Sequence, residues 1–161
     1  MLKSSRFHVA AFALMLFGLA AAHAHLDEAR PQPGAVVSEP PQVVELGFTM
    51  AVEVRFSTFK VYRLDVAQEA LPSNLSRPEE RELMRLNALA AELAQAVLAD
   101  GDVPSNAVRL GAAVEPESGT SRTVRMQLDE ELEPGVYVVV WEVLAIDTHW
   151  TNDHLLFLLA P

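Results

Sequence analysis

The sequence predicts an all-β sandwich or barrel that is interrupted by one α-helix. Short runs of alternating or β-branched apolar residues recur along the chain, at 43–48, 52–64, 108–114, 123–128, 136–146 and 154–159. Short strands separated by turn signals are typical of sandwiches and barrels. Pro33-Gly34 and Pro134-Gly135 supply turns, and the proline-rich residues 27–42 predict an extended arm.

A helix is predicted inside an insert at about 68–106. Ser76 and Glu79 have the spacing of a capping box, and Asp100-Gly101 supplies a stop. Between them an apolar stripe recurs at three- and four-residue steps: Leu83, Leu86, Ala90, Leu93 and Val97. A single stripe favours packing on the sandwich, and a partner-binding or dimer helix is the alternative.

The first 24 residues predict a secretory signal peptide. Lys3 and Arg6 precede an apolar run over 9–22, and the Ala-His-Ala triplet at 22–24 is a small-x-small cleavage signal. The expected mature chain starts at His25, with a cut one or two residues upstream as the alternative. The run is shorter than the ~20 residues of a spanning helix, which disfavours a membrane anchor.

Removal of residues 1–24 leaves residues 25–161, which is the size of one domain. Loss of the two basic residues of the signal changes the formal net charge from −10 to −12. A surface this acidic repels phosphate backbones and argues against nucleic acid as a partner. The chain has no cysteine, so thiolate zinc sites, iron–sulfur clusters and cysteine-ligated copper are excluded.

Three residues are candidate metal ligands. Cleavage after Ala24 would give His25 a free α-amine, and that amine and the imidazole Nδ1 can chelate one metal ion. Asp147 and His149 follow the strand predicted at 136–146 and, two residues apart, share a direction in extended chain. Three nitrogens and one oxygen suit Cu(II). The alternative is that Asp147-Thr148-His149 is a solvated loop in which Asp147 bonds its own backbone.

The sequence resembles the CopC/PcoC family of periplasmic copper-binding proteins. His25-Leu26 with residues 31–35 resembles the family opening "HA-x-L…S-x-P-A-x-G", and residues 43–49 resemble its "V-x-L-x-F" strand. Residues 132–143 resemble "L-x-x-G-x-Y-x-V-x-W-x-V", which a short link joins to "D-x-H", here Asp147-Thr148-His149.

This resemblance implies a Greek-key, immunoglobulin-like β-sandwich or barrel. It also implies one Cu(II) bound by His25, Asp147 and His149, and a role in periplasmic copper carriage, buffering or resistance, with no catalysis. A membrane copper transporter or another periplasmic copper protein is the partner it suggests. Two alternatives remain: an oxidase-type enzyme with an N-terminal copper-binding histidine, and a metal-free module that docks on a membrane copper transporter.

Several features depart from the family pattern. Thr148 stands where the family usually has Gly, and the insert at 68–106 is foreign to its short members. Because the insert is far in sequence from the candidate ligands, we expect copper binding not to need it. Scattered methionines argue against a Cu(I) site. His154 is a further candidate ligand, with a surface or supporting role as the favoured alternative.

Overall fold

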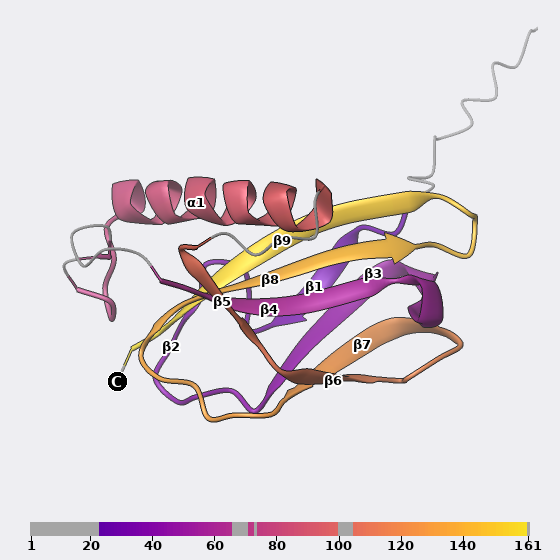
Figure 1. The fold of residues 1–161 in the computed structure, drawn as a ribbon, viewed down its shortest axis with the longest axis horizontal. Helices are drawn as coiled ribbons and strands as arrows, with labels where there is room; N and C mark the ends of the chain where they lie inside the picture. The colour runs from indigo at the N-terminus through magenta and orange to yellow at the C-terminus, as the bar shows by residue number, and fades with distance from the viewer. Residues whose placement is uncertain (1–22, 66–70, 73, 100–104, 161) are drawn as a thin grey trace, which may run out of the picture.

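The computed structural model describes residues 23–65, 71–72, 74–99 and 105–160. Two β-sheets pack face to face, and one long helix lies across the outer face of the second sheet (Figure 1). The first sheet has the strand order β1 (Leu26–Arg30), β3 (Val43–Glu53), β7 (Thr120–Leu128) and β6 (Ala112–Glu115). The second has the order β2 (Val36–Val37), β9 (Trp150–Leu159), β8 (Gly135–Leu144), β4 (Thr58–Leu64) and β5 (Ala107–Leu110).

The chain passes repeatedly from one sheet to the other, as in Greek-key sandwiches. A short 3₁₀ turn, η1 (Val54–Phe56), carries it from β3 to β4. The apolar run at 108–114 forms two strands rather than one, because the chain changes sheets at Gly111, between β5 and β6. The predicted β-sandwich with one helix is confirmed.

The middle of the second sheet is buried on both faces, which explains the unbroken apolar run from Val136 to Trp141 in β8 (Gly135–Leu144). Tyr137, Val139 and Trp141 of β8 point into the core between the sheets. Val136, Val138 and Val140 point to the opposite face and pack under the helix. A strand covered on both sides has no polar face to alternate with, so its sequence is continuously apolar.

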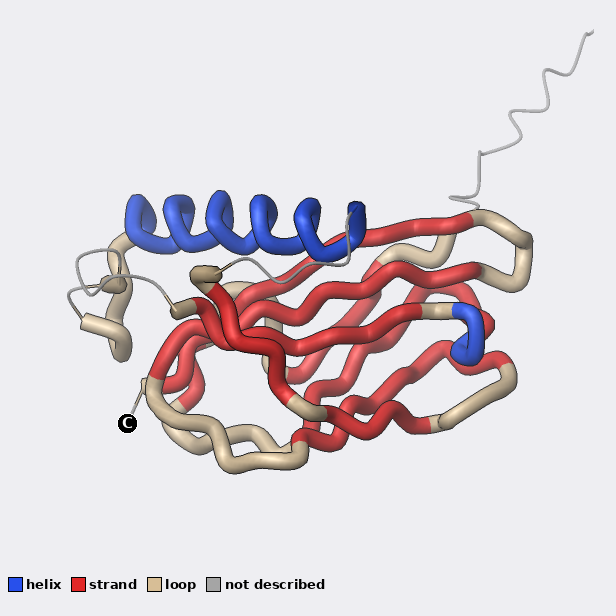
Figure 2. The backbone as a smooth tube through the Cα atoms, in the orientation of Figure 1, coloured by secondary structure: helices blue, strands red, loops and turns tan. Residues whose placement is uncertain are grey.

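The helix α1 (Glu80–Ala99) covers this outer face (Figure 2). Its buried residues are Leu86, Ala90, Leu93, Ala94 and Val97, and they form one cluster with residues of β4, β8 and β9. The stripe therefore packs on the sandwich. Among the described residues, no helix has the length and hydropathy needed to cross a membrane.

The helix begins three residues later than the capping pair predicted. Ser76 lies in a turn, where its N–H donates to Asn74 Oδ1. The capping contact comes instead from Glu82, whose carboxylate accepts the N–H of Glu79 at 2.7 Å. The predicted stop at Asp100-Gly101 lies outside the described residues.

Candidate metal centre

Asp147 and His149 lie in the tight turn that joins β8 to β9. The N–H of Ala145 donates to His149 O at 2.9 Å, and the N–H of Thr148 donates to Ala145 O at 2.9 Å. Thr148 has a left-handed backbone with φ of 72°. The two side chains were expected to converge because residues two apart share a direction in extended chain. They converge instead because the chain makes a tight turn between them.

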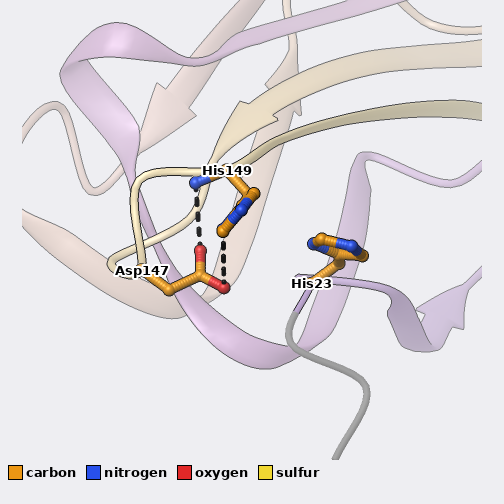
Figure 3. Close-up of side chains that lie close together, drawn as sticks. All are labelled: His23, Asp147 and His149. Carbon is orange, nitrogen blue, oxygen red and sulfur yellow. Dashed lines mark hydrogen bonds and ion pairs between the residues drawn. The ribbon is translucent and has the colours of Figure 1, made fainter. Parts of the chain in front are cut away.

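Within the turn, Asp147 makes contacts that keep its carboxylate charged. The N–H of His149 donates to Asp147 Oδ1 at 3.1 Å and holds the pKa of this carboxyl below its ordinary value, against the opposing effect of desolvation. His149 Nδ1 lies 3.3 Å from Asp147 Oδ2 (Figure 3). Asp147 is thus an anionic donor near neutral pH.

One oxygen of Asp147 is buried with little to satisfy it. In the part of the chain that the structure describes, Asp147 Oδ2 makes no well-formed hydrogen bond, and its ion-pair neighbour is His149 Nδ1 at 3.3 Å. A buried polar atom that is poorly satisfied is costly unless another ligand approaches it. A cation bound between Asp147 Oδ2 and His149 Nδ1 would be such a ligand, so this oxygen fits a metal ligand.

The third member of the cluster is His23. One imidazole nitrogen of His23, one carboxylate oxygen of Asp147 and one imidazole nitrogen of His149 lie within 4.8 Å of one another. The rings of His23 and His149 meet edge to face, with centroids 4.9 Å apart (Figure 3). The structure therefore brings together two of the three expected ligands, and it places His23, rather than His25, beside them.

The backbone around Ala24 fixes this arrangement. Ala24 is 1% exposed, and its carbonyl accepts a hydrogen bond from Thr151 Oγ1 at 2.9 Å. Thr49 Oγ1 donates to His23 O at 3.2 Å, and the N–H of Thr49 donates to His25 O at 2.9 Å. The segment is therefore docked between β3 and β9, with His23 next to the β8–β9 turn.

His25 is exposed and lies outside the three-residue cluster. Its ring centroid is 6.0 Å from that of His23.

Two sequence signals favour His23 as the first mature residue. Residues 20–22 are themselves a small-x-small triplet, and the family opening "HA-x-L" fits His-Ala-His-Leu with His23 in first place.

His154 lies on the other face of the second sheet. Along β9 it shares the direction of Leu156 and Leu158, which pack under α1. It lines a groove together with Ala94 and Leu98 of the helix. The described structure therefore separates His154 from the metal-ligand cluster.

The strained residue of the turn gives a first prediction. A β-branched residue at positive φ costs about 1–3 kcal/mol, whereas glycine adopts this conformation freely at an entropic cost of roughly 0.5–1 kcal/mol. Thr148 is exposed, so Thr148→Gly removes no packing. We expect it to raise the free energy of unfolding by about 1 kcal/mol, measured by urea denaturation, with unchanged copper stoichiometry. A lower stability would contradict the strain.

Comparison with known proteins points to one family. The chain matches the CopC domain over residues 26–102 and 76–160. Protein YobA of Escherichia coli K12 is 28% identical over 137 residues, which are 84% of this chain and 77% of YobA.

Solved structures share the fold. The crystal structure of PcoC, a methionine-rich copper resistance protein from Escherichia coli, aligns with a TM-score of 0.56 and 19% identity, over 86% of this chain and 99% of PcoC. CopC from Methylosinus trichosporium OB3b aligns with a TM-score of 0.50 and 22% identity, over 86% of this chain and 95% of that protein.

Proposed function

The chain belongs to the CopC family, and we propose from this premise that the mature protein holds one Cu(II) ion on His23, Asp147 and His149. The family consists of copper-binding resistance proteins and not of enzymes, so this chain is a binding protein. The proposed role is carriage or buffering of copper in the periplasm. A partner that receives the ion there, such as a membrane copper transporter, belongs to the same proposal.

The observation that carries this proposal is the convergence of donors from distant parts of the sequence. Ligand atoms of His23, Asp147 and His149 lie within 4.8 Å of one another, and the buried Oδ2 of Asp147 lies 3.3 Å from His149 Nδ1. If the signal peptide is cut after Ala22, His23 also offers its α-amine. Amine, two imidazoles and a carboxylate make a set of three nitrogens and one oxygen, which Cu(II) favours among divalent ions.

The methionines support Cu(II) rather than Cu(I). Cu(I) selects soft thioether ligands. Met126 is fully buried in the core, Met50 packs against that core, and Met84 lies exposed on α1. The three methionines are therefore placed as core side chains or on the exposed face of a helix, and not as a group of thioethers.

The mature N-terminus tests this assignment directly. We expect mass spectrometry of the exported protein to give His23 as its first residue. A cut after Ala24 would remove His23 and overturn this assignment.

Adding one glycine before His23 gives a second readout. The glycine keeps every side chain but moves the free amine away from the imidazole, so the chelate ring cannot close. We expect Cu(II) affinity to fall by at least about 100-fold. Mutating residues that only support a metal ligand already costs up to about 100-fold, and this change disrupts a ligand itself. Titration against a competing chelator measures it. Both measurements use His25→Ala protein, so that no other imidazole of the N-terminal segment binds the ion. The control carries His23→Ala in addition, and there the extension should change affinity far less.

A further inference from the structure

His25 is the third residue of a chain that begins at His23. A peptide with histidine in third place can wrap Cu(II) in a plane, using its α-amine, the backbone nitrogens of residues two and three, and the imidazole of residue three. The four nitrogens close three fused chelate rings, and tetragonal nitrogen donors suit Cu(II). His23-Ala24-His25 has the spacing that this chemistry requires.

In the folded chain, hydrogen bonds hold the segment against this second mode. The N–H of His25 donates to Thr49 Oγ1 at 3.1 Å and to His23 O at 3.0 Å. A backbone nitrogen that donates a hydrogen bond keeps its proton and has no lone pair for a metal. Ala24, which would supply another nitrogen, is buried and bonded through its carbonyl to Thr151.

The two modes also exclude each other through geometry. In the docked segment His23 faces His149, while the His25 ring stays outside the cluster. Binding by the backbone nitrogens of Ala24 and His25 requires the segment to turn around the ion and to leave Thr49 and Thr151. Asp147 and His149 then lose the ion.

We propose that the mature N-terminus is a copper switch with two exclusive binding modes. In the docked mode, the ion is held by His23, Asp147 and His149. In the undocked mode, it is held by the His23 amine, the backbone nitrogens of Ala24 and His25, and the His25 imidazole. Thr49 is the positioning residue that maintains the docked mode. This inference rests on the proposed function and on a mature chain that begins at His23.

The exchange between the modes balances its protons and has a direction. Passing from the docked to the undocked mode removes one proton from the backbone nitrogen of Ala24 and one from that of His25, and both go to solvent. Any partner that occupies Asp147 and His149 favours the undocked mode, because the ion then stays on the N-terminal segment.

The test uses mature protein whose start at His23 is verified by mass, loaded with one equivalent of Cu(II). Visible absorption and electron paramagnetic resonance are recorded at neutral pH. We expect Asp147→Asn, which weakens the docked mode, to move the absorption maximum to shorter wavelength, with nitrogen couplings from four donors. Adding His25→Ala should abolish this shift. Persistence of the shift in the combined variant would overturn the proposal.

Thr49→Val tests the restraint, because it keeps the branched shape of an exposed residue and removes only the hydroxyl. The fraction of copper with the four-nitrogen spectrum at neutral pH should rise by roughly five- to tenfold, since the hydroxyl no longer holds the docked segment. An unchanged fraction would remove Thr49 from the mechanism.

His149→Ala separates this inference from the proposed function. It should retain one Cu(II) at neutral pH, already with the four-nitrogen spectrum. His149→Ala combined with His25→Ala should lose that spectrum. Outright loss of copper in His149→Ala alone would refute the switch and leave the docked site standing. Absence of copper binding in the unsubstituted protein would refute the proposed function itself.

Discussion

In a chain that carries His25→Ala, replacing His149 by Ala is expected to weaken Cu(II) binding by at least about 100-fold. The His25→Ala background removes the alternative nitrogen set, so the measured loss belongs to the docked site. His149→Ala removes one nitrogen donor and leaves the buried Oδ2 of Asp147 without its neighbour. Asp147→Asn should act in the same direction, because it keeps an acceptor for the His149 N–H but removes the anionic charge. Competition with a chelator of known affinity measures both effects.

His154→Ala is the matched control for this experiment. His154 is also a histidine of the β8–β9 hairpin, but it faces the groove under α1 and lies outside the cluster. We expect its removal to leave Cu(II) affinity unchanged. Equal losses in His154→Ala and His149→Ala would mean that the ligand assignment is wrong.

Replacing Leu86 by Asp in the middle of α1 is expected to unfold the protein. Leu86 is fully buried between the helix and the second sheet. Loss of a buried leucine to alanine alone costs about 2–5 kcal/mol, and an unpaired buried carboxylate adds a further penalty. That sum approaches the ~5–15 kcal/mol that stabilises a typical domain. Circular dichroism and urea denaturation measure the effect.

Met84→Asp provides the comparison on the same helix, because the Met84 side chain is 58% exposed. We expect it to change stability by no more than about 0.5 kcal/mol. A stable Leu86→Asp protein would mean that α1 is dispensable. Sequence distance alone led us to expect copper binding without the insert, but the structure gives α1 a share of the core. Replacing residues 68–106 with a short loop would uncover Val136, Val138 and Val140 on the sheet.

Much of the fold was already determined by local sequence patterns. Alternating runs predict strands because the two faces of a strand meet different surroundings, and β-branched runs predict them because these residues favour extended backbone. Both signals can be read from a few neighbouring residues. The stripe from Leu83 to Val97 predicts an amphipathic helix for the same reason. The sequence could not show which surface the helix covers. The run from Val136 to Trp141 is apolar on both faces because α1, distant in sequence, packs on the side away from the core.

The candidate site divides in the same way. The sequence predicted Asp147 and His149 as a pair, since a two-residue spacing at the end of a strand is local. Their actual convergence depends on a turn with Thr148 at positive φ. The identity of the third ligand depends on where the signal peptide is cut. His23 and His25 are two residues apart and each follows a possible cleavage signal, so the sequence alone left the first residue of the mature chain open.

Only the tertiary structure puts His23 beside His149, because the burial of Ala24 and the hydrogen bonds from Thr49 and Thr151 fix where the segment docks. Those contacts join residues 26 and 127 positions apart in the chain. A local pattern carries no information about pairings at such separations, whereas the strands that meet at this edge of the sandwich determine them.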